Sequence, residues 1–128
     1  MLDHVGLPVA DFARSKDFYL KALAPLGYTI AMEVPPEKAG GTSHAGFGAD
    51  GRPQFWIGSG QPIKGRMHFA FMAKNRAAVR AFHEAALRAG AKDNGPPGLR
   101  PQYHKNYFGA FVLDPDGHNI EAVCHLPE

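Results

Sequence analysis

The chain has 128 residues, of which 45% are apolar, 11% aromatic and 20% charged, so it fits one globular domain and is not a disordered chain. Its formal net charge is only +2 and its charges are intermixed, which gives nucleic-acid binding little support. The longest uninterrupted apolar run, residues 69–73, is far shorter than the roughly 20 residues that cross a bilayer, and no signal-peptide layout precedes it. We therefore expect a cytoplasmic protein with neither a nucleic-acid nor a membrane partner.

The single cysteine limits the metal chemistry that is available. Cys124 cannot form an internal disulfide, and it cannot by itself supply the ligands of a structural zinc site. Any metal must therefore be held by histidine and carboxylate side chains. The 15 glycines and 11 prolines mostly separate periodic stretches, as is typical of short strands joined by tight turns.

The chain contains a weak internal repeat at an offset of 64 positions, half of its length. Residues 3–23 match residues 67–87, and the matched pairs include His4 and His68, Asp11 and Asn75, and Phe18 and Phe82. Each half predicts a strand, a helix and three further strands. We therefore expect one domain, 1–128, made of a first module over 1–60 and a second over 66–126, joined by a short polar linker.

In the first half, a strand is expected over 2–9, and Asp11 is a suitable N-cap for a helix that Gly27 ends. The apolar face of this helix is expected to hold Phe12, Tyr19, Leu23 and Leu26. Three short strands follow over 28–34, 44–48 and 54–58.

The second half repeats this order. A strand is expected over 66–73, followed by a helix that Asn75 caps and Gly90 closes. Its apolar face is expected to hold Val79, Phe82, Ala86 and Leu87, and strands follow near Lys92, over 107–113 and over 118–124. The predicted fold class is α+β.

Strand alternation places three candidate metal ligands on one face. Successive side chains of a strand point to opposite faces, and the apolar row of each predicted strand should pack under a helix. This leaves His4, His68 and Glu121 on the concave, helix-free side. Two imidazoles and one carboxylate can hold a divalent first-row metal and leave coordination positions open for catalysis. The alternative is that three polar side chains simply line a wet groove.

The paired halves, the strand-borne His4 and His68, and the run 114–121, DPDGHNIE, resemble the vicinal oxygen chelate superfamily. This superfamily includes glyoxalase I, extradiol dioxygenases, fosfomycin-resistance transferases and bleomycin-binding proteins. The resemblance implies two tandem βαβββ modules whose strands curl into a cup with the helices outside. It also implies a divalent metal, Fe, Mn, Zn or Ni, and a homodimer whose site is built within one chain or across two.

This sequence departs from the family at one position, and the departure argues against glyoxalase I activity. Glyoxalase I has a second carboxylate in the last strand of the first half, where this sequence has Phe55 or, after a one-residue shift, Trp56 or Gln54. Without that base, proton abstraction next to a carbonyl is disfavoured. The three-ligand pattern fits dioxygenases and thiol transferases better. Bleomycin-binding members generally lack the metal set.

The run 101–107 supplies further candidates. His104 could act as an acid or base and Tyr107 as a donor to a developing oxyanion, unless this loop only packs on the sheet. Arg66 and Arg100 could hold a substrate carboxylate or phosphate. Tyr103, Phe55 and Trp56 are further candidates for the substrate pocket, the last two with core packing as the alternative.

The remaining histidines, His44, His83, His118 and His125, are not expected to be metal ligands, and Cys124 is expected to be a packing thiol. Two functions are left. The first is a divalent-metal-dependent enzyme, a dioxygenase, lyase or isomerase, or transferase, acting on a small oxygen-bearing substrate. The second is a non-catalytic small-ligand-binding protein of the bleomycin-resistance kind.

Overall fold

The computed structural model describes residues 1–128 and arranges eight strands in two four-stranded sheets. The first sheet has the order β1-β4-β3-β2 and the second β5-β8-β7-β6, and in each the first strand is parallel to its neighbour while the other pairs are antiparallel. The strands are β1 (Val5–Val9), β2 (Thr29–Val34), β3 (His44–Gly48), β4 (Phe55–Ser59), β5 (His68–Met72), β6 (Lys92–Leu99), β7 (Phe108–Leu113) and β8 (Asn119–Cys124). The same βαβββ topology thus occurs twice, which confirms the predicted α+β fold.

Each module has one main helix, α1 (Phe12–Leu23) or α2 (Arg76–Arg88). Both predicted N-caps are present, because the Asp11 side chain accepts from the Arg14 amide at 3.1 Å and that of Asn75 from the Ala78 amide at 2.8 Å. A short turn, η1 (Ala24–Leu26), extends α1, and the chain then leaves it through Gly27 at φ 86°. A second short turn, η2 (Pro36–Lys38), was not predicted.

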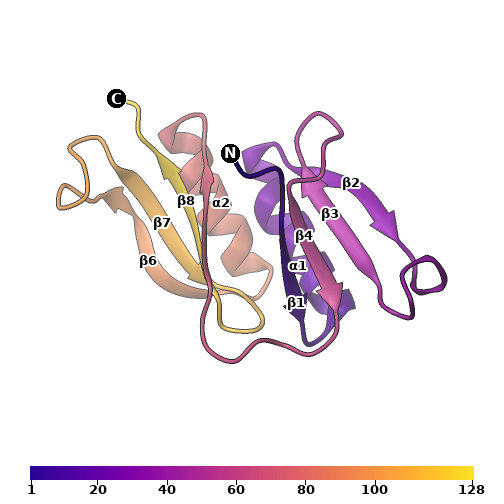
Figure 1. Ribbon diagram of the computed structural model, residues 1–128. Coiled ribbons are helices and arrows are strands. Elements are labelled where there is room, and N and C mark those ends of the chain that lie inside the picture. The colour runs from indigo at the N-terminus through magenta and orange to yellow at the C-terminus, as the bar shows by residue number, and fades with distance from the viewer.

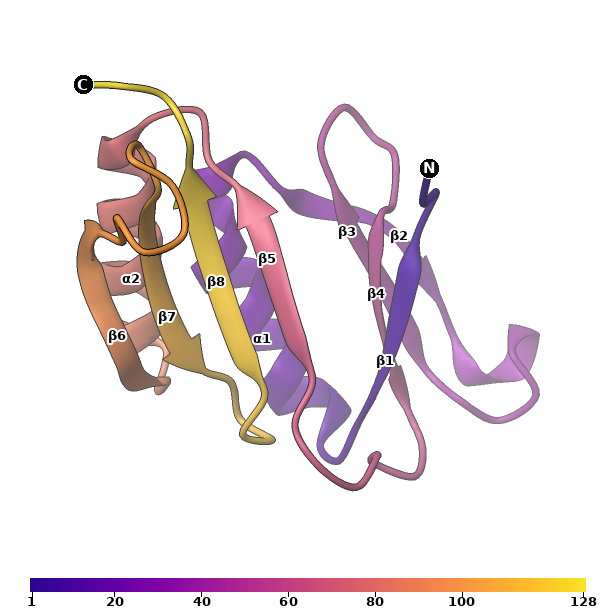
Figure 2. The same ribbon diagram turned by 60° about the vertical axis from the view of Figure 1, so that its left-hand side comes forward.

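The helices share one side of the molecule. They pack against each other, and each covers one face of its own sheet, while the opposite sheet faces carry no helix (Figure 1). Strands β1 and β5 are the neighbouring edges of the two sheets and run in opposite directions (Figure 2). Any chemistry on the helix-free faces is therefore distributed over two sheets that meet edge to edge.

A single apolar cluster spans both modules. Phe55 is central to it, since its ring centroid lies 5.0 Å from that of Tyr19, 5.4 Å from Phe69 and 5.3 Å from Phe71. The buried Tyr19 hydroxyl donates to Asp114 of the other module. The modules are therefore held together by both packing and a buried hydrogen bond.

Several details differ from the sequence prediction. Leu87 is 38% exposed, although it was assigned to the apolar face of its helix. The reason for Leu87 is that α2 packs against α1 and η1 as well as its sheet, so Ala78 belongs to its buried face instead. Strand β6 continues through two prolines, which is possible because it is an edge strand with register shifts. None of the helices is long and apolar enough to cross a membrane.

Candidate metal and ligand site

Glu121 is the buried centre of the second helix-free face. It lies on β8 between Ala70 of β5 and Phe111 of β7, and it is only 1% exposed. Its Oε2 is 3.0 Å from Nε2 of His68, and its Oε1 accepts a hydrogen bond from the Tyr107 hydroxyl. A carboxylate removed from water needs such partners, because an unpaired buried charge is very costly. Both oxygens of Glu121 are thus engaged.

Gly109 makes the contact between Tyr107 and Glu121 possible. A Cβ at this position would lie 3.2 Å from Glu121 Oε1 and 3.2 Å from Tyr107 Cε1. The glycine therefore leaves room for the phenol to approach the carboxylate. Burial, and then the bond to Glu121, raise the pKa of Tyr107 well above its ordinary value, so the hydroxyl stays a donor.

His68 is the first residue of β5, and its other nitrogen is also fixed. Nδ1 lies 3.1 Å from the Asn119 carbonyl oxygen, and the ring stacks on Phe111 at 6.2 Å between centroids. A carbonyl oxygen only accepts, so Nδ1 carries a hydrogen. Nε2 donates to Glu121 Oε2 when the ring is protonated, and in the neutral ring it presents a lone pair to that oxygen instead. An imidazole lone pair next to a carboxylate oxygen suits a shared divalent cation.

His4 lies elsewhere in this chain. It precedes β1, is exposed, and its Nδ1 is 2.7 Å from Asp3 Oδ2, a contact that lowers the pKa of Asp3. His4 lines a pocket of about 320 Å³ that includes Ala70 and Met72 of β5 but not His68. No group of three His, Cys, Asp or Glu side chains in the chain is placed to hold a metal ion. The structure therefore brings together His68 and Glu121, without His4.

The strand register identifies the first-module counterpart of Glu121. Glu121 is paired with Ala70 in β5, and the equivalent pair in the first sheet joins Trp56 to Gly6 of β1. The matching residue is thus Trp56, which corrects the first alignment with Phe55. Phe55 points instead into the core, where it is 2% exposed, although it also borders the pocket of His4. Neither residue is a carboxylate.

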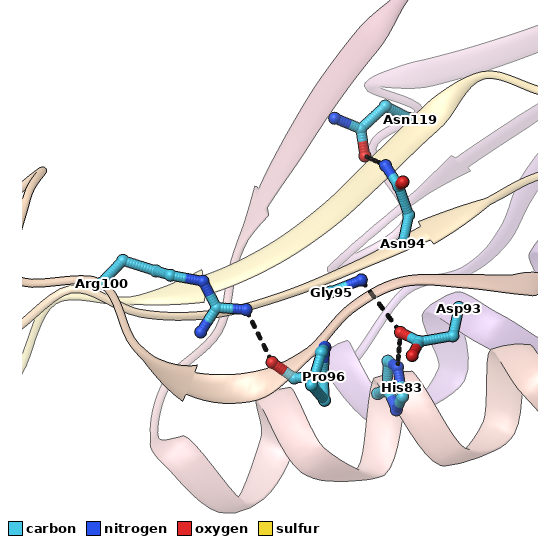
Figure 3. A network of polar contacts seen from close by, with 7 residues as sticks. All are labelled: His83, Asp93, Asn94, Gly95, Pro96, Arg100 and Asn119. Carbon is cyan, nitrogen blue, oxygen red and sulfur yellow. Dashed lines mark hydrogen bonds and ion pairs between the residues drawn. The ribbon is translucent and has the colours of Figure 1, made fainter.

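Arg100 and His68 both contact the aromatic ring of Phe111. The Arg100 guanidinium is 5.4 Å from the Phe111 ring that also stacks on His68, and its Nη2 donates to the Pro96 carbonyl at 2.7 Å (Figure 3). Arg100 makes no ion pair with any carboxylate of the chain. Arg100 is half-buried as a residue, and its guanidinium has no carboxylate partner.

The other predicted pocket residues are more exposed. Arg66 donates from Nε to the Gly117 carbonyl at 3.1 Å, which ties it to the turn before β8. Tyr103 is 63% exposed and packs edge-on against Tyr107 at 5.1 Å. His104 is exposed, and its ring lies 5.8 Å from that of His125. These side chains therefore lie around Tyr107 or at the turn before β8, rather than against the Glu121 carboxylate.

The remaining histidines have other partners. His83 is 3.0 Å from Asp93, whose pKa is lowered first by the Gly95 amide and then by this contact (Figure 3). His118 is 1% exposed, and its Nδ1 accepts from the Met67 amide at 3.0 Å. His118 thereby anchors the backbone directly before His68. A larger pocket, about 580 Å³, lies between η1 and the C-terminal segment.

The repeated βαβββ modules and the face holding His68 and Glu121 define a small tandem-module α+β protein with a histidine and carboxylate pair. A family model described as the glyoxalase/bleomycin resistance protein/dioxygenase superfamily matches residues 1–122. The chain therefore belongs to that superfamily, and the resemblance found from the sequence is confirmed. No curated protein matches the chain.

Solved structures show the same fold. The chain is 27% identical to a glyoxalase/bleomycin resistance protein from Albidiferax ferrireducens T118, with a TM-score of 0.74 and coverage of 97% of this chain and 98% of the other. A glyoxalase I mutant from Zea mays has 24% identity and a TM-score of 0.70, with coverage of 95% of this chain and 46% of that one. A mutant of the fosfomycin resistance protein FosX from Listeria monocytogenes, solved as a complex with Mn(II), has 20% identity and a TM-score of 0.66, with coverage of 96% and 88%.

Proposed function

We propose that this protein is a divalent-metal-dependent enzyme acting on a small oxygen-bearing substrate, by dioxygenase, lyase or isomerase, or transferase chemistry. The observation that carries the proposal is the 3.0 Å approach of His68 Nε2 to the buried Glu121 carboxylate on a helix-free face. A buried carboxylate beside an imidazole lone pair is a donor set suited to Fe, Mn, Zn or Ni. Glyoxalase I remains disfavoured, because Trp56 stands where a second carboxylate would be needed.

A metal held by His68, Glu121 and His4 would bind substrate oxygens and stabilise the charge that develops on them. The FosX structure was solved with Mn(II), so this fold is compatible with a divalent ion. Within this chain, Tyr107 would orient the Glu121 carboxylate, and the Asn119 carbonyl would orient His68. These contacts hold both ligands on a rigid part of the sheet.

We propose that a second copy of the chain supplies the third ligand. His4 precedes β1 and His68 opens β5, and the two strands run in opposite directions (Figures 1 and 2). A five-residue strand is about 13 Å long, so the two histidines lie toward opposite ends of the neighbouring edges. We therefore assign His4 of one copy to the His68 and Glu121 of another, in a homodimer with two equivalent sites.

The other predicted residues are assigned around this centre. Arg100, which has no carboxylate partner, would hold a carboxylate or phosphate of the substrate, and Arg66 is the second candidate for that role. Tyr107 would stabilise negative charge on a substrate oxygen, which requires it to exchange its present bond to Glu121. His104 is assigned as the acid or base from the neighbouring loop, with Tyr103 at the pocket rim.

A second candidate function is non-catalytic binding of a small apolar or aromatic molecule. It is favoured by the 320 Å³ pocket, which Tyr28, Phe55, Phe69 and Phe71 line, and by the lack of a three-ligand group within one chain. The two functions differ in whether ligand binding depends on a metal. The lone Cys124, which leaves the chain without a disulfide, is consistent with the cytoplasmic location that we expect in either case.

Elemental analysis of the untagged protein tests the metal proposal. After reconstitution with Mn, Fe, Zn or Ni, we expect about one ion per chain, and we expect His68→Ala and Glu121→Ala to lose it with the fold retained. His83→Ala is the matched control, since His83 pairs with Asp93 on another face and its loss should leave the ion in place. Wild-type protein that binds no ion, or a His68→Ala variant that keeps its ion, would contradict the proposal.

A further inference from the structure

The helix-free face of the first module combines aromatic rings with strand glycines. On β4 the residues of this face are Trp56 and Gly58, and their neighbours on β3 are Gly46 and His44. An ideal Cβ at Gly46 would lie 2.8 Å from Trp56 Cε2, and one at Gly58 would lie 2.8 Å from His44 Nδ1. Each ring therefore lies across the glycine of the adjacent strand. His44 is also held at its other nitrogen, 2.8 Å from Thr42 Oγ1.

Gly6 on β1 is a third glycine of this face, and neither crowding nor backbone conformation explains it. It pairs with Trp56, but a Cβ there would meet only Trp56 Cβ, at 4.0 Å, and Gly6 does not have a positive φ. A glycine inside a strand is less favourable than alanine, because it loses more conformational freedom on folding. The equivalent residue of the second module is Ala70, so this strand position accepts a side chain. Such a glycine is typical of a site that another molecule approaches closely.

The missing side chain leaves a small pocket beside the two rings. The pocket has a volume of about 250 Å³, and Gly6, Pro8, His44, Trp56 and Gly58 are among its lining residues. An engineered cavity of about 150 Å³ binds benzene, so the space is large enough for one substituted six-membered ring. Apart from the imidazole of His44, no side chain that lines it is ionisable. Size and polarity therefore agree with a small uncharged ring.

Trp56 connects this pocket to the candidate metal ligand. It also lines a neighbouring pocket together with His4, Arg52 and Met32. A molecule with a ring beside Trp56 and polar substituents on one edge would extend toward His4. This places the ring pocket next to the first-module part of the proposed site.

We infer that the Trp56 and His44 pocket binds an uncharged aromatic ring of the substrate, so that the substrate class is a small monocyclic aromatic compound with oxygen substituents. The assignment to a substrate rests on the proposed function, whereas ring binding itself requires no metal. Trp56 and His44 would supply aromatic contacts with the ring.

The test is binding of p-cresol to chelator-treated protein, followed by NMR through the indole N–H signal of Trp56, the one tryptophan of the chain. p-Cresol has no adjacent oxygen atoms, so its binding does not depend on metal chelation. We expect saturable shifts of the Trp56 and Gly6 signals, and none with 4-methylcyclohexanol, which has the same substituents on a saturated ring. Equal binding of both compounds, or no binding of p-cresol, would overturn the inference.

Substitutions at Gly6 test whether the p-cresol ring binds in this pocket. Gly6→Val should weaken p-cresol binding at least about tenfold, and Gly6→Ala less, because both add atoms to the pocket at a position where a Cβ meets only Trp56 Cβ, at 4.0 Å. Ala13→Val, on the exposed side of α1, is the matched control and should bind p-cresol as wild type does. A Gly6→Val variant that loses its dimeric state but binds p-cresol normally would show that a second chain fills the pocket, against the inference. Wild-type protein that binds p-cresol but takes up no metal on reconstitution would contradict only the proposed function.

Discussion

The helix-free faces of the two modules share a backbone but differ in chemistry. On the second face, β8 pairs with the edge strand β5 and carries Glu121, which is buried between His68 and Tyr107. On the first face, the equivalent position holds Trp56, which lies over Gly46 beside the open space at Gly6. Because the helix-covered face of each sheet supplies the core, the opposite face is free to differ. Under the two proposals, the second face would supply the metal ligands His68 and Glu121, and the first module would supply His4 and the ring pocket.

Adjacent residues of β4 test this separation of faces most strongly. Phe55→Ala should lower the free energy of unfolding by about 3–5 kcal/mol, because the ring is buried among Tyr19, Phe69 and Phe71. Trp56→Ala, on the other face, should cost about 1 kcal/mol or less, since Trp56 is only half-buried. Urea unfolding followed by far-UV circular dichroism measures both. Similar losses for the two variants would show that Trp56 belongs to the core.

Tyr107 tests whether the second face is organised around the Glu121 carboxylate. Tyr107→Phe removes the hydrogen bond to Glu121 and should weaken metal binding about 10–100-fold. Tyr103→Phe is the matched control, because Tyr103 is exposed and its hydroxyl has no contact with Glu121. Isothermal titration of each metal-free variant with Mn(II) or Zn(II) gives the affinities. Unchanged affinity in Tyr107→Phe would separate this tyrosine from the metal site.

Tyr19 joins the modules and gives the smallest effect of the three. Tyr19→Phe should cost about 1–2 kcal/mol at neutral pH, because the buried Asp114 carboxylate loses a donor. Burial, and then Asp114, raise the pKa of Tyr19 well above its ordinary value. A raised pKa adds stability that is present below about pH 10, the unfolded value, and is lost as the pH rises further.

Wild-type protein should therefore lose stability more steeply above about pH 10 than Tyr19→Phe does. Chemical unfolding at a series of alkaline pH values measures this slope. Parallel pH profiles for the two proteins would mean that the Tyr19 hydroxyl titrates normally in the folded state.

Local sequence patterns predicted much of this structure. Both N-caps, Asp11 and Asn75, accept the expected amide hydrogen bonds, and strand alternation placed Glu121 and His68 on the same face. The reason is that capping and alternation depend on residues close together in the chain. The repeat, read at a constant offset, fixed the order of elements in both halves.

Relations between distant elements were not available from these patterns. Alternation assigns a face but gives no direction for one strand relative to another, so it could not show that β1 and β5 are antiparallel neighbours (Figure 2). The bond from Tyr107 to Glu121 passes close to Gly109, and a lone glycine in a strand is a weak signal in one sequence. The pairing of Gly6 with Trp56 likewise required the observed register.

The central claim, a site shared between two copies, is tested most directly by mixing two defective chains. His4→Ala and His68→Ala protein should each bind no metal alone. A heterodimer of the two would contain one intact site, with His4 from the second variant and His68 and Glu121 from the first. We predict that co-refolding restores about one ion per heterodimer, measured by elemental analysis after separation with two affinity tags. A heterodimer without metal, or an ion retained by His4→Ala alone, would contradict the account.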